Sequence, residues 1–359
     1  MLASPHLPKP QWLKVRFPAG DRYHEIKRLL RDHGLHSVCE EAGCPNIGEC
    51  FNAGEATFII LGDVCTRSCG FCSVTSGRPQ TLDLMEPLRL ARTVDLLALD
   101  YAVITSVNRD DLPDGGAGVW AACIRAIRHL RPQCQVEILT PDFEGNWDAL
   151  RTVVEAQPVV YNHNLETVPR LYRHVRPKAR YQRSLEMLGR IKQIDPAMTT
   201  KSGIMVGLGE TLDEVAQTMS DLRGHQVDLL TIGQYLQPDA KHLPVVRYWH
   251  PDEYAQLRDI GQRLGFAHVE AGPFVRSSYH AGAQSRAAIT NKPIASQRAS
   301  ARGAAIPGQP PDSKKSSLTP ERISSVRQDS NQSQRYSPSP RKEKGLGGEV
   351  TPLPFYDDR

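Results

Sequence analysis

Apolar, β-branched runs alternate along most of the chain with stretches of helical periodicity. The runs predicted to be strands cover residues 57–61, 101–105, 135–139, 159–162, 203–206 and 229–232, with a further candidate at 268–270. Helices are predicted between them, for example at 118–131 and 212–223, and another at 21–34, because apolar residues recur there every three or four positions. Strand–helix repetition implies a parallel sheet, so the pattern predicts an α/β fold with six such units.

The composition changes at about residue 283. From there serine, proline, arginine, lysine and glutamine dominate without apolar periodicity, and we expect residues 283–359 to be disordered. This segment carries 13 Lys or Arg residues against 7 Asp or Glu residues, a formal charge of +6, whereas residues 1–282 carry −2 of the chain's net charge of +4. Such a basic tail can contact nucleic acid or an acidic protein surface, or it can be a solvated extension without function.

Six of the eight cysteines lie between residues 39 and 72, in two groups of three. The chain begins MLASPHLPKP, without an apolar signal stretch or a transmembrane run, so we expect a cytoplasmic protein with reduced thiols. Zinc sites usually have four ligands, often as C-x2-C pairs, and neither group has that form. Iron–sulfur clusters fit better, and each triplet leaves one iron of a cubane for another ligand. Cys123 and Cys134 are expected to be core thiols.

The second triplet, CTRSCGFC, follows a buried strand and has CxxxCxxC spacing with the aromatic Phe71 before its last cysteine. This resembles the radical S-adenosylmethionine (SAM) enzymes; a structural metal knuckle is the alternative. The resemblance implies that Cys65, Cys69 and Cys72 hold a [4Fe-4S] cluster whose open iron binds SAM, in a partial (βα)6 TIM-type barrel. Cleavage of SAM supplies a radical for C–H bonds that no side-chain acid or base activates. Functional residues should lie at the C-terminal ends of the strands.

The first triplet, Cys39, Cys44 and Cys50, lies in HSVCEEAGCPNIGECFNAGEATFIILG, which looks closely like the auxiliary-cluster segment of lipoyl synthases. The resemblance continues in order over about residues 8–282, through WLKVRFP, SVNRDDLPDGGA, VEILTPDF, YNHNLETV, YQRSLEML, KSGIMVGLGET and GPFVRSSYHA. It implies three parts: residues 1–56 as an extension with the auxiliary-cluster motif, 57–282 as the radical SAM partial barrel ending in RSSY, and 283–359 as the tail.

The resemblance also implies ligands other than cysteine. In the family the second serine of RSSY, here Ser278, is the fourth ligand of the auxiliary cluster, and Arg276 would lie beside that anionic cluster. Alkoxide oxygen is a harder donor than thiolate, so its iron should detach most easily; from spacing alone, such serines are turn residues and Arg276 a surface charge. A lone His163 is expected to form hydrogen bonds rather than bind a metal. SAM contacts are expected at Phe71, Asn108, Asp110, Glu137, Asn164, Arg183 and Lys201.

A lipoyl synthase would insert two sulfur atoms at C6 and C8 of an octanoyl group linked to a lysine of a carrier protein. Two SAM molecules would be cleaved per product, and the sulfur would come from the auxiliary cluster. The implied partners are octanoylated lipoyl carrier domains, such as 2-oxoacid dehydrogenase E2 subunits and the glycine cleavage H protein. A low-potential donor such as ferredoxin or flavodoxin and iron–sulfur carrier proteins would also be needed; neither a membrane nor nucleic acid is expected as a partner.

Two alternatives remain open at this stage. A non-enzymatic adaptor with zinc-bound cysteines and a basic tail would be colourless, whereas an iron–sulfur protein is brown. Biotin synthases and methylthiotransferases are the nearest enzymes, but neither explains three upstream cysteines at this spacing together with the RSSY motif.

Overall fold

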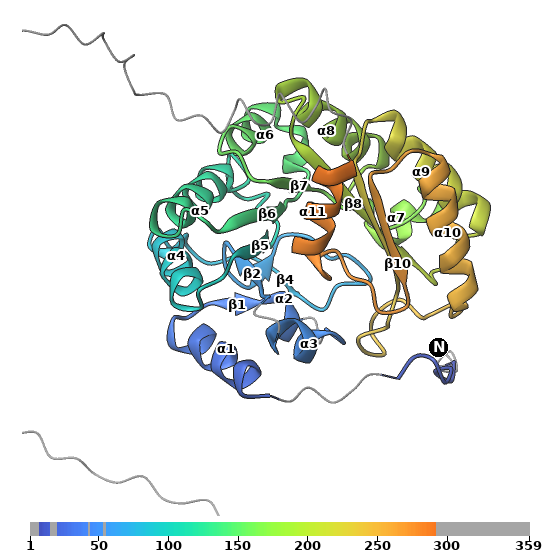
Figure 1. The fold of residues 1–359 in the computed structure, drawn as a ribbon, viewed down its shortest axis with the longest axis horizontal. Coiled ribbons are helices and arrows are strands. Elements are labelled where there is room, and N and C mark those ends of the chain that lie inside the picture. Colours follow the sequence, from blue (N-terminus) through green and yellow to red (C-terminus); the bar gives the residue numbers. More distant parts are fainter. Residues whose placement is uncertain (1–6, 15–19, 42–43, 53–54, 292–359) are drawn as a thin grey trace, which may run out of the picture. The chain divides into compact units, whose positions relative to one another are not determined.

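Parallel strands form the centre of the fold. The computed structural model describes residues 7–14, 20–41, 44–52 and 55–291. The main sheet has the strand order β1-β2-β5-β6-β7-β8-β9-β10, with the bounds β1 His36–Ser37, β2 Thr57–Ile60, β5 Tyr101–Ser106, β6 Gln135–Leu139, β7 Val160–Asn162, β8 Thr199–Val206, β9 Leu229–Gln234 and β10 His268–Gly272. Neighbours from β2 to β10 are parallel, and β1 is antiparallel to β2. The sheet curves into an open barrel, which confirms the predicted partial barrel (Figure 1).

Helices follow the strands and cover the outside of the sheet (Figure 1). They are α4 Glu86–Leu96, α5 Ala117–Leu130, α6 Trp147–Val154, α7 Tyr172–Val175, α8 Tyr181–Ile194, α9 Leu212–Gly224 and α10 Pro251–Arg263. In α5 the buried face contains Trp120, Cys123 and Ile124. The apolar recurrence in the helix predicted at 118–131 puts Val119, Cys123, Ala126 and Leu130 on one face. The observed buried face is rotated from it by about one position, and Leu130 is 38% exposed. The reason is tertiary, because α5 packs against both α4 and α6.

The start of β8 differs from its prediction. The strand begins at Thr199, four residues before the expected residue 203, and the added residues Thr199–Ser202 are polar but buried. A criterion based on apolar runs misses them because their partners lie elsewhere in the chain. Lys201, for example, pairs with Glu137 of β6.

A helix inside the predicted tail corrects the boundary placed at residue 283. Helix α11 spans Ala281–Asn291 and lies centrally in the view of Figure 1. Ala281 packs with Tyr101, and Ala288 packs with Val160 and Leu229. These partners begin β5, β7 and β9, so α11 covers the N-terminal end of the barrel. Its small residues fit closely without the large apolar stripe that marks a helix in the sequence. Residues 292–359 lie outside the described part of the chain.

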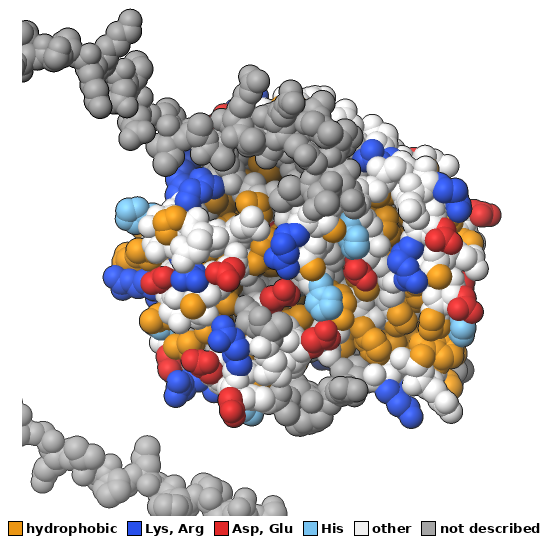
Figure 2. Space-filling model, viewed as in Figure 1, with side chains coloured by type: hydrophobic (Ala, Val, Ile, Leu, Met, Phe, Trp, Pro, Cys, Tyr) orange, Lys and Arg blue, Asp and Glu red, His pale blue; other side chains and the backbone are white. Residues whose placement is uncertain are grey.

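The N-terminal segment packs beside β1 and β2 through the helices α1 Asp21–Asp32, α2 Val38–Glu41 and α3 Ile47–Asn52. Helix α1 confirms the helix expected at 21–34, with Ile26 and Leu30 buried. No helix in the described ranges is long and apolar enough to cross a membrane. Charged side chains of both signs are interspersed over the face in Figure 2. The part of this face that the structure describes therefore has no extended field of one sign.

Candidate functional site

The second cysteine triplet lies in a loop directly after β2. Leu61 and Gly62 take positive φ values of 69° and 92°, which turn the chain out of the strand. The loop then forms β3 (Val64–Cys65), which pairs with β4 (Thr75–Ser76). The backbone N–H groups of Arg67 and Asn108 donate to the Cys65 Sγ at 3.4 and 3.3 Å. These two N–H groups orient the sulfur that is expected to act as a ligand.

The three thiols of this loop are unbridged and lie close to one another. Cys65 is buried, while Cys69 and Cys72 are half-buried. The pKa of the Cys72 thiol is raised to about 11, mainly by burial and also by the neighbouring Cys69 and Cys65 sulfurs. Burial also raises the pKa of Cys69, which the nearby Arg176 opposes. The structure thus brings together the three residues expected to hold the SAM cluster.

Ion pairs hold this loop against the C-terminal ends of the strands. Arg67 donates from Nε and Nη2 to both carboxylate oxygens of Asp110, each at 2.8 Å, and its Nη2 lies 2.7 Å from the Asp142 Oδ1. Arg183 lies 2.7 Å from the Asp142 Oδ2. Burial alone would raise the pKa of Asp142, but the two arginines hold it below its usual value. Asp110 and Arg183, expected as SAM contacts, are therefore both engaged in ion pairs. Sequence reasoning missed Asp142, although it lies in the matching segment VEILTPDF.

Glu137 and Lys201 do not lie at the strand ends, which corrects that expectation. They pair in the barrel interior, with 2.9 Å between the Lys201 Nζ and the Glu137 Oε1, and both side chains are at most 1% exposed. The Tyr101 hydroxyl donates to the other Glu137 oxygen at 2.7 Å. Removing one partner would leave a buried charge uncompensated. The pair thus has a structural role in the barrel and is already satisfied.

Several polar atoms around the barrel interior are buried and lack a hydrogen-bond partner in the described part of the chain. They are Ser106 Oγ, Asn108 Oδ1, Asn162 Nδ2 and Oδ1, and Asn164 Oδ1. Unpaired buried polar groups are costly, so they indicate a polar ligand. Asn108 and Asn164 were expected to contact SAM, while Ser106 and Asn162 were not singled out in the sequence. Their place at the ends of predicted strands was the available signal.

The other candidates have structural surroundings. Phe71 packs against the cluster of Val175, Leu208 and Tyr235. His163 is buried and interacts through Nδ1 with the Thr140 carbonyl and through Nε2 with the Ser184 hydroxyl. Burial lowers the pKa of His163 to about 4, so it is neutral and bound on both nitrogens, as expected. Cys123 and Cys134 are buried core thiols, as predicted.

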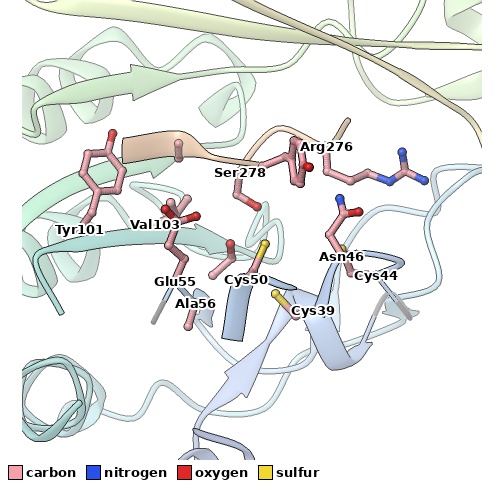
Figure 3. A pocket seen from close by; sticks show the side chains of 13 residues that line it. Cys39, Cys44, Asn46, Cys50, Glu55, Ala56, Tyr101, Val103, Arg276 and Ser278 are labelled. Atoms are coloured by element: carbon pink, nitrogen blue, oxygen red, sulfur yellow. The ribbon is translucent and has the colours of Figure 1, made fainter. Parts of the chain in front are cut away.

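The first triplet lines a pocket at the seam between β2 and the segment after β10 (Figure 3). Cys39 belongs to α2, Cys50 belongs to α3, and Cys44 lies between the two helices. The pocket has an empty volume of about 390 Å³. Its lining includes Ser278, whose side chain is directed toward Cys50 in Figure 3, and Arg276, near the Cys44 end. The structure therefore brings together the three auxiliary-cluster cysteines and the serine proposed to complete them.

Two sets of hydrogen bonds tie the helical segment to the segment after β10. The Asn46 amide donates to the Phe274 carbonyl at 2.7 Å. The Tyr279 hydroxyl donates to the Glu49 carboxylate, and His280 Nε2 lies 3.0 Å from the same group. These contacts join the two parts of the chain that contribute donors to the pocket.

The donors at both cysteine sites fit iron–sulfur clusters. The pKa of Cys39 is raised to about 12, mainly by burial and also by the neighbouring Cys44 sulfur, so a bound metal must displace the proton. Arg276 is near Cys44 and offsets part of the negative charge that a thiolate carries. Within the described ranges no three His, Cys, Asp or Glu side chains converge closely enough to hold one metal ion. The fit rests on the number and softness of the donors, three sulfurs at each site.

Comparison with known protein families gives two matches. The family described as "Radical SAM superfamily" matches residues 59–222, and the "N-terminal domain of lipoyl synthase of Radical_SAM family" matches residues 3–44. The first contains the second cysteine triplet, and the second contains the first two cysteines of the other triplet.

Individual proteins are similar over most of the described chain. Lipoyl synthase of Rubrobacter xylanophilus is 61% identical over 276 residues, covering 77% of this chain and 86% of that protein. Lipoyl synthase of Alcanivorax borkumensis is 57% identical over 277 residues, covering 77% and 85%. That of Methylococcus capsulatus is 58% identical over 279 residues, covering 77% and 87%. Among solved structures, Streptococcus suis SuiB bound to precursor peptide SuiA has a TM-score of 0.48 and 12% identity over 69% of this chain and 52% of that chain, a likeness too distant to add to the argument.

Proposed function

The chain belongs to the lipoyl synthase family of radical SAM enzymes, and on that premise we propose how its residues divide the work of the reaction. It is a radical SAM sulfurtransferase with two [4Fe-4S] clusters, and it inserts two sulfur atoms at C6 and C8 of a protein-bound octanoyl-lysine. When bound, the cofactors supply a 5′-deoxyadenosyl radical that removes hydrogen from each carbon, and the sulfur that replaces it. The protein residues hold, orient and shield these groups.

Cys65, Cys69 and Cys72 are the proposed ligands of the SAM cluster. Support comes from their common loop and from the backbone N–H groups that donate to the Cys65 Sγ. The Arg67 ion pairs hold the loop, whereas the unpaired Asn108 and Asn164 oxygens can accept hydrogen bonds from the polar parts of SAM or the substrate. Asp110 and Arg183 are proposed to act mainly through the ion-pair cluster that frames this site.

Cys39, Cys44, Cys50 and Ser278 are the proposed ligands of the auxiliary cluster. The observation that carries the proposal is the lining of one pocket by three thiols and a serine from the opposite end of the described chain (Figure 3). Thiolates match a sulfide-bridged iron better than an alkoxide does, so the iron at Ser278 is the one that leaves most easily. Arg276, which lines the same pocket, is proposed to stabilise the anionic cluster.

The substrate is an octanoylated lipoyl carrier protein, and the finer partners are proposed from the family. Carrier domains of 2-oxoacid dehydrogenase E2 subunits and the glycine cleavage H protein would present the octanoyl-lysine. Ferredoxin or flavodoxin would supply electrons, and iron–sulfur carriers would rebuild the auxiliary cluster. We propose the cytoplasm as the location, because ligand cysteines must stay reduced.

The test is direct thiolation. Anaerobically reconstituted protein is incubated with SAM, a low-potential reductant and an octanoyl-lysine peptide, and the peptide is then analysed by mass spectrometry. We expect two added sulfur atoms and 5′-deoxyadenosine. A colourless zinc-loaded protein that forms neither product would contradict the proposal and support the adaptor alternative.

A further inference from the structure

Ser277, next to the proposed ligand Ser278, has a partner across the barrel. The RSSY motif assigns the role of ligand to Ser278 and no role to Ser277. In the structure its Oγ accepts a hydrogen bond from the Asn164 Nδ2 at 2.6 Å, although the two residues are 113 positions apart. Asn164 follows the end of β7, so this bond ties the segment between β10 and α11 to the C-terminal edge of the sheet.

The Asn164 amide is fixed in one orientation. Its Nδ2 also donates to the Glu166 Oε1 at 3.0 Å, which uses both amide hydrogens. Its Oδ1 is buried and has no partner among the residues that the structure describes. A Cβ on Gly203 would lie 2.6 Å from that oxygen, so the glycine leaves the space that the amide occupies. The donors of Asn164 are committed to protein groups, and its acceptor is open.

Glu166 connects this amide to the other cysteine triplet. Its backbone has a positive φ of 69°, held by a bond from its N–H to the Gly203 carbonyl and a bond from the Met205 N–H to its own carbonyl. Its carboxylate interacts with Arg176, and both groups act on the Cys69 thiol. Polar and charged side chains therefore extend from the serine segment toward the SAM-cluster loop.

Other hydrogen bonds of the segment that carries Ser278 go to the region of α3, through the Phe274 carbonyl and through the Tyr279 and His280 side chains, and not to the C-terminal edge of the sheet. The segment's backbone bonds are local turns, from Val275 to Gly272 and from Tyr279 to Arg276. The side-chain bond of Ser277 is consequently a contact that can set how far the segment approaches the pocket.

We propose that Ser277 is a positioning residue that, through Asn164, holds the neighbouring Ser278 oxygen in reach of the auxiliary cluster. The inference rests on the proposed function for the role of Ser278. The position of the Ser278 oxygen thus depends on a residue at the C-terminal edge of the sheet, which also surrounds the SAM-cluster loop.

The test compares Ser277→Ala with Ser277→Thr, which keeps a hydroxyl acceptor, and with Asn164→Ala. In full-length protein reconstituted with both clusters, we measure the rate at which a chelator removes one auxiliary iron, together with the Mössbauer signal of that iron. Ser277→Ala should lose iron roughly fivefold faster, as expected for one lost hydrogen bond. Threonine should restore the parent rate, and the double variant Ser277→Ala/Asn164→Ala should be no faster than either single one. Thr152→Ala removes a hydroxyl from the exposed side of α6. It is the control for effects of purification and reconstitution on the rate of iron loss.

A second readout does not need the clusters. In metal-free protein, amide hydrogen exchange in the peptide covering residues 273–281 should be faster in Ser277→Ala and Asn164→Ala than in the parent. Parent-like iron loss with an unchanged Mössbauer signal would overturn the proposal, as would equal effects of alanine and threonine at position 277. If the parent binds no auxiliary cluster, the proposed function fails, whereas the exchange measurement still tests the Ser277 contact. If Ser277→Ala does not fold, Asn164→Ala is compared with the parent in the same measurements, because it removes the same hydrogen bond.

Discussion

The two cysteine triplets are held in different ways. Cys65, Cys69 and Cys72 come from one loop after β2, and groups at the strand ends surround them. The auxiliary pocket instead combines the segment of α2 and α3 with Ser278, which follows the last strand of the sheet. A local motif therefore places one set of donors. The other set forms only when the segment of α2 and α3 packs against the segment that follows β10. The two sites should consequently fail separately and for different reasons.

The largest expected effect comes from replacing the three cysteines of one site at a time. Replacing Cys65, Cys69 and Cys72 by alanine should abolish SAM cleavage while leaving about half of the iron, because one cubane remains. Replacing Cys39, Cys44 and Cys50 should preserve SAM cleavage but stop sulfur delivery. Iron analysis, 5′-deoxyadenosine formation and peptide mass are the measurements.

Cys123→Ala is the matched control, since that thiol is buried in α5 away from both triplets. It should retain both clusters and both activities. Formation of 5′-deoxyadenosine by the first triple variant would show that the second triplet does not hold the SAM cluster.

Replacing the side-chain oxygen of Ser278 should have the next largest effect. Ser278→Cys should still assemble the auxiliary cluster but lose at least about tenfold in product per cluster, because a thiolate holds the departing iron more tightly. Ser278→Ala should leave that iron open to exogenous ligands. Single-turnover product yields and Mössbauer spectra of the unique iron measure these effects. Parent-like yield from the cysteine variant would show that a labile oxygen ligand is unnecessary.

Truncation should distinguish α11 from the residues after it. Deleting residues 292–359 should leave turnover nearly unchanged, since their composition cannot build a core. Deleting residues 285–359 also removes the buried Ala288 and the Ser285 side chain, which hydrogen-bonds the Tyr101 hydroxyl. That deletion should lower the free energy of unfolding by about 2 kcal/mol and weaken auxiliary iron binding.

Thermal unfolding and iron content compare the two truncations. Equal behaviour would mean that the C-terminal part of α11 does not support the pocket. If deleting residues 292–359 is enough to abolish activity, those residues have a functional role.

The effect that is smallest at neutral pH is a pH dependence of the free energy of unfolding, which arises at His163 beside Arg176 and Asp142. His163 has a pKa of about 4 in the folded protein, against 6.5 for an ordinary histidine. The unfolded chain therefore binds the proton first, so the free energy of unfolding should fall as the pH drops from about 6.5 to about 4, by on the order of 3 kcal/mol. His163→Gln should flatten this dependence, measured by urea unfolding of the metal-free protein. An equally steep dependence in the variant would assign the protons to other groups.

The sequence predicted the elements whose pattern is local. Six strands and the helices between them follow from apolar runs, and the CxxxCxxC loop follows directly after the first of them. The start of β8, the buried face of α5 and helix α11 were wrong or missed. In each case small or polar residues are buried against partners far away in the chain, and the binary pattern contains no information about those partners.

The sequence by itself determined the chemistry, since six cysteines in two triplets with a downstream RSSY motif define which donors are available. Only the tertiary structure decided which of the predicted contacts are open. It paired Glu137 with Lys201, engaged Asp110 with Arg67 and left the Asn164 oxygen free. The physical reason is that a motif specifies residue types at local spacing, whereas charge pairing and burial depend on which strands become neighbours.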